Sequence, residues 1–559
     1  MKFPPRDAKF RQERFEAAHK IMRHCMNSAP QRAIENRIRK NIYLFGTASG
    51  EDTRLNKVKP ILRRLASFLY SQDSIQFWVE LLADEFNAQC FEWLETVSDH
   101  INDAWHETCA DEKARLGVEW STVKGAMIFY AKADALTDSS YIVQSYLIEP
   151  ENFGVWREDI TELDRQEAVC HASYKSRPEL ERLLVRHPQR AEILAGLETA
   201  PSDAGVNSNV FPSSLSPLSS DVSAITGIAP ETPGGRSNYQ PDNPDVLYRL
   251  YELTAWDDTL GDFNVFTFSS QHLIYDRPLS ELSVSGLYPY VKISADEMPG
   301  YFWGASGVDD LAPLQEWNAD RLAKLDKLFG LILEPPTAVI GPVGGLTEEK
   351  VAQFRKGRGV MALGQPGSDV KQFQPQIPDS AFMMLEAVEN YFIETAGMRP
   401  AMFGKPEPGV RTEGMAASYL RLGGSETRAR ALTIERQLEQ CATLIFLLKR
   451  KYETTKLQAA NGDVFTLSLF PEGARVRVDG HSSSPLFIED HSQTVMALAR
   501  LGVIDERSIL DLLPSLPYRS LFKYRLKDRW MANMVAEAVH KRQQQDKREG
   551  KEAGPKKAA

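Results

Sequence analysis

Cysteine is scarce in this sequence, and its spacing excludes the usual metal and disulfide frameworks. The five cysteines are scattered over 559 residues and form no Cys-x-x-Cys pair. Zinc sites and small disulfide-rich folds place cysteines at short, regular intervals. We therefore expect reduced thiols and no metal centre. The five positions are Cys25, Cys90, Cys109, Cys170 and Cys441.

Long hydrophobic runs are also missing. Ala442–Leu448, with its one threonine, is among the longest and falls far short of the roughly 18 residues that span a bilayer. Met1–Arg6 contains no apolar segment typical of a signal peptide. We expect a soluble, intracellular protein with no membrane partner.

The chain carries fewer positively than negatively charged residues. Lysine and arginine total 66 against 76 aspartate and glutamate residues, which gives a net charge of −10. This balance argues against a protein that coats itself in nucleic acid, because phosphate binding needs clustered cations. It does not exclude DNA that passes through a channel without being held. The length is enough for three or four domains.

The motifs of common catalytic sites are incomplete. No Gly-x-x-x-x-Gly-Lys-Ser/Thr occurs, so no P-loop is present. His106-Glu107 begins like a zinc-protease helix, but Ala110 stands where the second histidine belongs. Around Ser482, a nucleophile elbow would need glycine at Ser484. We expect no enzyme activity and no cofactor, and a serine hydrolase built on Ser482 is a minor alternative.

The most regular pattern lies between Gly304 and Tyr452. A first helix follows the Ser306–Asp309 capping box and ends before Pro335. Proline is tolerated at a helix start, so the helix proper could begin only at Pro313. Its apolar stripe is Leu314, Trp317, Leu322, Leu325 and Phe329. Asp309 and Asp310 suit its N-terminus.

Two further helices follow. The second runs from about Ser380 to Thr395, behind Asp379, and leads into a loop rich in proline and glycine from Gly397 to Thr412. The last carries a heptad-like stripe. This stripe consists of Ile434, Leu438, Cys441, Ile445, Leu448 and Tyr452.

Three short stretches of sequence, together with this order of helices and loops, resemble a known protein family. They are Gly304–Leu311 before the first helix, Thr395–Gly404 after the second, and Arg411–Met415 before the last. Together they resemble the core of the portal (head–tail connector) proteins of tailed double-stranded DNA bacteriophages. The likeness covers roughly residues 140–500 and is faint at both ends of the chain.

The resemblance implies a mixed α+β, helix-rich portal fold that forms a ring, with wing, stem, clip, tunnel loop and crown. Its long helix would pack against the neighbouring subunit. The implied parts are a helical wing segment (1–138), a mixed wing (139–306) with a disordered loop at about 200–244, a first stem helix (307–333), a clip (334–378), a second stem helix (379–396), a tunnel loop (397–414), a long helix with return strands (415–500) and a helical crown with a basic tail (501–559).

The resemblance also implies a function. Portal proteins form homo-oligomeric rings, here expected to be a dodecamer, at one capsid vertex of the virion, assembled in the host cytoplasm. Double-stranded DNA is packaged and ejected through the ring. The partners implied are the terminase large subunit, which hydrolyses ATP, then the head–tail adaptor, and the major capsid and scaffolding proteins. Another capsid or adaptor component is the alternative.

Two basic groups are the implied contact sites. Arg399, Lys405 and Arg411 would line the DNA channel from the tunnel loop, unless they pair with Glu407 and Glu413 on an ordinary surface loop. In the clip, the basic cluster would meet the terminase or adaptor, unless it only complements a helix C-terminus. That cluster is Arg355, Lys356 and Arg358.

The rest of the chain divides by pattern. Residues 7–135 look mostly helical, with Ile75, Trp78, Leu82, Phe86 and Trp93 on one helix face. The basic stretch Glu35–Asn41 suits either a solvated helix face or a DNA-binding arm.

Later segments favour strands. These are 141–148, a hairpin of 246–255 and 262–269, 287–293, 337–340, 359–363, 464–469 and 474–478. Asp257 and Asp258 would lie in the hairpin connection. Further helices are expected near 347–354, 490–501 and 505–513. The basic tail could contact packaged DNA or only aid solubility.

Overall fold

The structure is a computed structural model. It describes residues 1–49, 55–72, 75–81, 88–135, 141–185, 247–269, 272–284, 286–333, 337–340, 369–372, 379–398, 425–459, 462–471 and 473–478, with 187, 189–191, 193 and 194. The predicted loop at 200–244, the helices at 347–354, 490–501 and 505–513, the strand at 359–363 and the C-terminal tail lie outside these residues.

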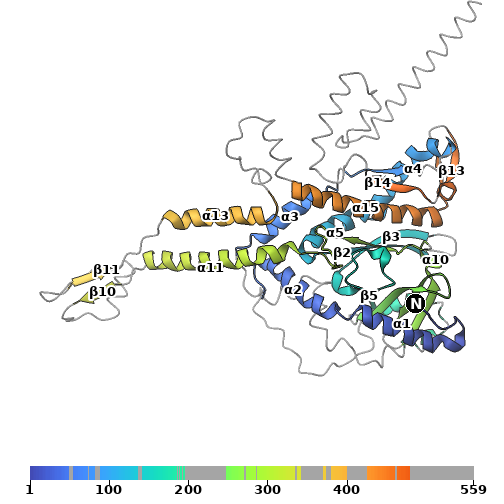
Figure 1. Ribbon diagram of the computed structural model, residues 1–559, viewed down its shortest axis with the longest axis horizontal. Coiled ribbons are helices and arrows are strands. Elements are labelled where there is room, and N and C mark those ends of the chain that lie inside the picture. The colour runs from blue at the N-terminus through green and yellow to red at the C-terminus, as the bar shows by residue number, and fades with distance from the viewer. Residues whose placement is uncertain are drawn as a thin grey trace, which may run out of the picture.

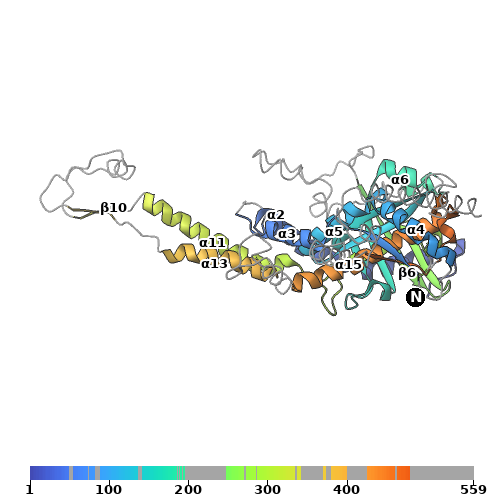
Figure 2. The ribbon, with the colours of Figure 1, turned by 90° about the horizontal axis from the view of Figure 1, so that it is seen from above.

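A two-helix stalk projects from a broad body (Figure 1). α11 (Gly307–Leu333) runs outward and α13 (Asp379–Thr395) returns beside it. At the tip, β10 (Thr337–Ile340) pairs antiparallel with β11 (Asp369–Gln372). Figure 2 shows the same projection from a second direction. Below, "stalk" means α11 and α13, and "body" means the remaining described elements apart from the two tip strands.

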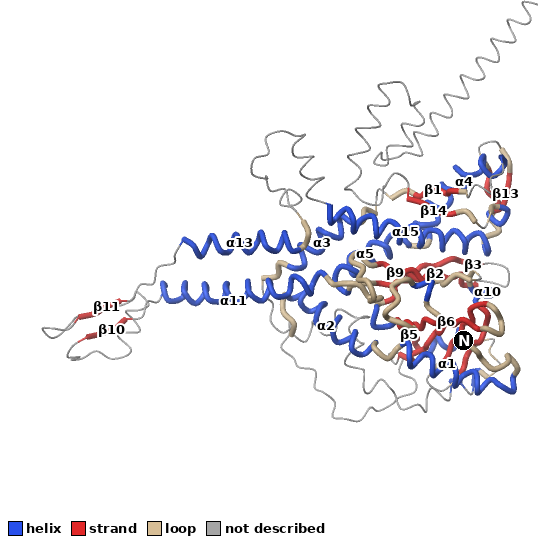
Figure 3. The backbone as a smooth tube through the Cα atoms, in the orientation of Figure 1, coloured by secondary structure: helices blue, strands red, loops and turns tan. Residues whose placement is uncertain are grey.

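The body contains helices around two main sheets, and the tube in Figure 3 shows the strands gathered there. Its helices are α1 (Arg11–Cys25), α2 (Ala29–Phe45), α3 (Val58–Leu69), α4 (Ala88–Glu107), α5 (Ala110–Lys124), α6 (Arg177–Leu183), α10 (Leu279–Leu282) and α15 (Ser425–Tyr452). Short 3-10 helices lie at η1 (Ala8–Phe10), η3 (Pro150–Asn152), η4 (Leu163–Arg165) and η6 (Leu467–Leu469).

Both main sheets are antiparallel. One has the order β4-β5-β6-β7-β8 and the other β3-β2-β9, while β1 pairs with β14 and β12 with β13. The strands are β1 (Phe77–Glu80), β2 (Met127–Ala135), β3 (Tyr141–Ile148), β4 (Phe153–Val155), β5 (Ala168–Ser176), β6 (Leu247–Asp257), β7 (Asp262–Phe268), β8 (Leu273–Pro278), β9 (Tyr290–Ile293), β12 (Lys456–Gln458), β13 (Val464–Thr466) and β14 (Arg475–Val478). The mixed α+β class is therefore confirmed.

The apolar stripe of α15 forms the centre of the largest core. Ile434, Leu438, Cys441, Ile445 and Leu448 are each 0% exposed. They pack within this chain, where α15 contacts α3, α4, β2, β9 and β14. The stripe was predicted correctly, and its side chains are used within the subunit; the expected contact of the helix with a neighbouring subunit would have to involve its other faces.

The expected helix face around Ile75 and Trp93 is also wrong. Phe77–Glu80 is strand β1, whose side chains alternate between buried and exposed, and Trp78 points outward with 44% exposure. β1 exists because it pairs with β14, about four hundred residues further along the chain. Such distant pairing leaves no trace in local periodicity. β2 likewise interrupts the segment that was predicted to be helical.

Two smaller expectations need correction. α11 begins at Gly307, so Pro313 lies inside the helix instead of starting it, and its ring is exposed to solvent. Asp257 is the last residue of β6 and is fully buried, whereas Asp258 lies in the connection as expected. The carboxylate of Asp257 is tolerated inside because the guanidinium of Arg14 lies 3.6 Å away.

Candidate functional site

The outer half of the stalk carries large apolar side chains that nothing in the described structure covers. Leu333 at the end of α11 is 78% exposed and Met383 near the start of α13 is 70% exposed. Soluble monomers rarely expose contiguous apolar patches of this kind, so such a surface points to a partner. The other exposed members are Phe329, Leu331, Ile332, Phe382 and Met384, and Tyr391 is exposed in the inner half of α13.

The charges of the stalk are mostly negative. α13 contains no lysine or arginine, and the cations of α11 are Arg321, Lys324 and Lys327. Lys324 is already paired with Asp320 at 2.6 Å. Together the two helices carry three basic and nine acidic residues. The acidic ones are Asp309, Asp310, Glu316, Asp320, Asp326, Asp379, Glu386, Glu389 and Glu394.

The base of α11 is held in the body through a buried amide. Gln315 is 1% exposed; its Nε2 donates to the carbonyl of Leu55 at 2.8 Å, and its Oε1 accepts from the backbone N–H of Lys57 at 3.1 Å. Lys57 also pairs with Glu389 of α13 at 2.6 Å. One short segment before α3 therefore fixes both stalk helices.

The basic stretch in α2 contributes to the same base. Arg39 binds the carboxylate of Asp309 at the start of α11, with Nη2 to Oδ2 at 2.6 Å. The side chain is 22% exposed, and its other donors reach Asn36 and the carbonyl of Lys124. This arginine therefore has a structural use, which favours the helix-face interpretation of Glu35–Asn41 over a DNA-binding arm.

A second anchor lies where α13 ends and α15 begins. Thr427 Oγ1 donates to the carbonyl of Gly397 at 3.0 Å, and Arg430 Nη1 donates to the carbonyl of Ala396 at 3.1 Å. Met398 is 2% exposed and packs in the main core. Gly397 adopts a φ of 69°, a left-handed conformation that glycine adopts without strain. The described residues on either side of positions 399–424 are therefore held close together.

The predicted contact residues themselves lie outside the described residues. This holds for the tunnel-loop cations Arg399, Lys405 and Arg411, for the clip cluster and for Ser482. The clip cluster consists of Arg355, Lys356 and Arg358.

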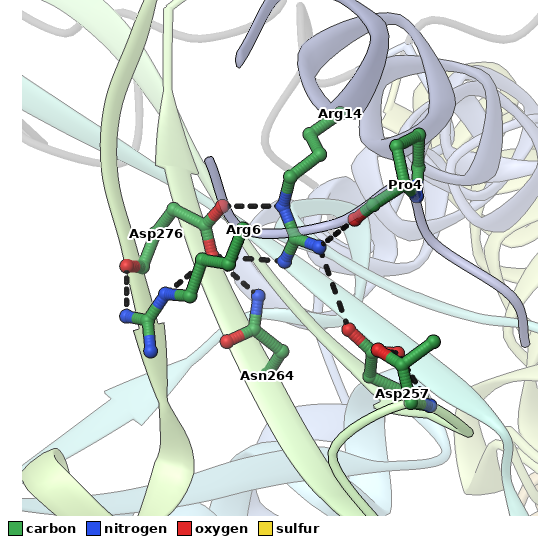
Figure 4. Close-up of polar contacts among 7 residues, drawn as sticks. Pro4, Arg6, Arg14, Asp257, Asn264 and Asp276 are labelled. Atoms are coloured by element: carbon green, nitrogen blue, oxygen red, sulfur yellow. Dashed lines mark hydrogen bonds and ion pairs between the residues drawn. The ribbon is translucent and has the colours of Figure 1, made fainter. Parts of the chain in front are cut away.

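Sequence reasoning missed a buried polar network between α1 and the five-stranded sheet (Figure 4). Arg14 is 2% exposed; its Nε donates to Asp276 Oδ2 at 2.7 Å and its Nη2 to Asp276 Oδ1 at 3.1 Å. Asn264 also donates to Asp276, at 2.6 Å. Local spacing gave no signal, because these residues come from helix and strands far apart in the sequence.

A second missed cluster joins the two main sheets. Tyr130 and Tyr290 both donate to Oε1 of Glu252, at 3.0 and 3.1 Å. His171 Nδ1 lies 2.9 Å from the hydroxyl of Tyr290. Burial, reinforced by the charge of Glu252, raises the pKa of both tyrosines, and burial lowers the pKa of His171. These groups hold β2 and β9 against β5 and β6.

Two common kinds of site are absent from the part of the chain that the structure describes. Those residues contain no group of three or more histidine, cysteine, aspartate or glutamate side chains placed to hold a metal ion. None of the described helices combines the length and apolar character needed to cross a membrane.

Comparison with known proteins adds no family assignment. The sequence matches no protein-family model and no curated protein.

Proposed function

We propose that this protein is a portal subunit, which forms a ring-shaped channel for double-stranded DNA at one vertex of a phage capsid. The observation that carries the proposal is the apolar outer half of the stalk. The sequence resemblance and the order of α11, tip strands, α13 and α15 support it.

The apolar stalk argues for assembly. Side chains such as Leu333 and Met383 gain favourable free energy when neighbouring stalks cover them, at about 25 cal/mol for each Å² of apolar surface. The exposed residues come from both helices, so both helices would take part in contacts between neighbouring stalks. Repeated head-to-tail contacts close into a ring when the rotation between subunits divides a full turn. A dodecamer is the proposed ring.

The charge of the stalk suits a channel that must not hold DNA. Asp309 and Glu389 are paired with cations of the body, and Asp320 with Lys324, which leaves six carboxylates and two cations on the stalk. This acidic excess would repel phosphate along the wall.

Within this proposal, Arg399, Lys405 and Arg411 contact the duplex from the tunnel loop, whose first residue, Gly397, is held by the second anchor. Their number is small enough for the duplex to slide.

The remaining assignments follow from the same proposal. Arg355, Lys356 and Arg358 belong to the clip end of the stalk, where the terminase large subunit and later the head–tail adaptor dock. The body meets the major capsid and scaffolding proteins. The protein is not an enzyme in this scheme and resides in the virion.

The test is the mass and shape of the purified protein. Mass photometry is expected to give a species many times heavier than the 62.9 kDa chain, and negative-stain images a ring with a central hole. A monomer at micromolar concentration over a range of salt would contradict the proposal. A compact oligomer without a hole would favour another capsid or adaptor component.

Stalk variants test the observation that carries the proposal. Phe382→Asp with Met383→Asp is expected to leave the body folded, with unchanged far-UV circular dichroism, and to abolish the ring. The matched control is Val464→Asp with Leu469→Asp, at two body positions that are 62% and 65% exposed. Loss of the ring in the control but not in the stalk variant would place the interface elsewhere.

A further inference from the structure

A cavity rich in arginine lies in the body, between the N-terminal segment, α1 and β8. Its volume is about 440 Å³. Arg6, Arg11, Arg14 and Arg277 line it, together with the carboxylates of Asp7 and Asp276. Four guanidinium groups therefore face two carboxylates. Neither the stalk nor the proposed function accounts for this excess of positive charge.

Part of this charge is used within the protein. Asp276 accepts from Arg14 and Asn264, and its Oδ1 lies 3.8 Å from Nε of Arg6 (Figure 4). Arg14 is buried between Asp276 and Asp257, and it also donates to the carbonyl of Pro4. The Arg14–Asp276 pair is thus one fixed wall of the cavity and not a binding group.

Arg11 has unused donors. Its Nη2 donates to the carbonyl of Leu273 at 2.8 Å, and lies 3.5 Å from Nε2 of His187. That nitrogen carries a hydrogen, which it donates to the carbonyl of Ile274 at 2.8 Å, so it cannot accept one from Arg11. Among the described residues, no carboxylate lies within ion-pair distance of the Arg11 guanidinium.

The histidine beside Arg11 is held neutral. Nδ1 of His187 accepts from the backbone N–H of Gln189 at 3.2 Å while Nε2 donates, so both ring nitrogens are engaged as in neutral imidazole. Burial lowers the pKa of His187, and the charges of Arg11 and Arg277 lower it further. The charges of Arg11 and Arg277 therefore both reach the His187 ring, and together they give this part of the cavity a positive potential.

Arg277 completes this region. Its guanidinium carbon lies 4.2 Å from the ring centroid of Tyr275, so the ring supports the side chain without neutralising it. In the described part of the chain, no carboxylate pairs with Arg277 either. Its planar N–H donors remain available to a ligand.

We propose that this cavity binds a terminal phosphate dianion, either inorganic phosphate or a small phosphate monoester. Two unpaired guanidinium groups match two negative charges, and the arginine fork matches phosphate oxygens better than a lysine would. The volume exceeds that of a phosphate group alone and lies within the range of small-ligand pockets. The site does not depend on the portal proposal.

Isothermal titration of the full-length protein with inorganic phosphate, at constant ionic strength against chloride, tests the proposal. The wild type is expected to show saturable binding that Arg11→Gln with Arg277→Gln weakens at least tenfold. Arg277→Lys, which keeps the charge but not the fork, is expected to weaken it less. The matched control is Arg23→Gln, an exposed arginine at the other end of α1, which should bind as the wild type does.

Three outcomes would overturn the proposal. One is the absence of saturable binding to the wild type, and another is an equal loss in Arg23→Gln. The third is displacement of bound phosphate by a duplex oligonucleotide at equal phosphate concentration, which would assign the cavity to a nucleic-acid backbone. The double variant should melt within a few degrees of the wild type in chloride, which confirms that its loss of binding is local.

Discussion

Arg430 Nε lies 2.6 Å from Asp296 Oδ1, although 134 positions separate the two residues in the sequence. The same guanidinium donates to the carbonyl of Ala396 at 3.1 Å, so one side chain of α15 holds the segment after β9 and the end of α13 together. The side chain is 15% exposed, which limits screening of these contacts by water.

Arg430→Ala is therefore expected to destabilise the protein by about 2 kcal/mol, because it leaves Asp296 and a backbone carbonyl without their charged donor. Urea unfolding followed by tryptophan fluorescence measures this. Arg436→Ala, at an exposed position of the same helix, should change the unfolding free energy by less than about 0.5 kcal/mol. Equal effects in the two variants would show that the Arg430 contacts add nothing.

The lowered pKa of Glu453 predicts that the free energy of unfolding depends on pH. Burial alone would raise its pKa, but the hydrogen bond from His100 at 3.0 Å and the charges of His100 and Lys449 outweigh burial and lower the pKa to about 2. The folded pKa lies below the unfolded value, so the stabilisation is fully present above about pH 4.5 and is lost as the pH falls through about 2.

Glu453→Gln is thus expected to be less stable than the wild type near neutral pH, and the difference should shrink as the pH is lowered from about 5 towards 2. Urea midpoints at several pH values check this. Glu107→Gln is the control, because Glu107 also contacts Lys449, at 3.1 Å, but is 64% exposed. A gap between Glu453→Gln and the wild type that stays constant with pH would contradict the assignment.

Cys109 offers a stabilising substitution. Cys109 is exposed, and its backbone φ of 53° lies in the left-handed region. Residues other than glycine adopt this conformation only at a cost in free energy. Cys109→Gly is expected to raise stability by about 0.5–1 kcal/mol, since the strain removed exceeds the added entropy of the unfolded chain. Differential scanning fluorimetry measures the shift.

Cys109→Ala keeps the β-carbon and should not share this gain. If alanine stabilises the protein as much as glycine does, backbone strain is not the reason.

The proposed channel predicts an effect of charge reversal in the tunnel loop. Lys405→Glu with Arg411→Glu should leave ring assembly intact and reduce packaging or retention of DNA. Every subunit of the ring carries both changes, so two rings of positive charge around the channel become rings of negative charge. The defect should become smaller as salt rises, since charges are strongly screened beyond about 10 Å at roughly 0.1 M. Packaging assays with purified rings measure it.

Normal packaging by assembled rings would show that these charges do not act on DNA. Failure of the rings to form would place the loop at a subunit interface instead.

Sequence pattern predicted the elements whose stabilising contacts are local. The end of α11 follows from Pro335, the bounds of α13 follow from Pro378 and Asp379 before it and Gly397 after it, and the β6–β7 hairpin follows from its short connection at Asp258–Gly261. The buried stripe of α15, from Ile434 to Leu448, was visible as helical spacing.

Sequence pattern failed where the stabilising partner is distant. β1 needs β14, and buried Arg14 needs Asp276 at 262 positions away. A charged residue in an amphipathic helix is usually solvated, so nothing local distinguishes Arg14 from Arg23. The arginine cavity depends on four residues contributed by the N-terminal segment, α1 and β8, and no sequence motif links them.

The buried anchor at Gln315 makes the outer stalk a mechanical lever. The part of α11 from Gln315 to Leu333 is about 27 Å long at roughly 1.5 Å per residue. A tilt of about 5° at the anchor displaces the end of α11 by about 2 Å, which is enough to break a hydrogen bond made there. Small rotations within the body, where Leu55 and Lys57 hold the amide, are thus amplified into changes of contact at the tip.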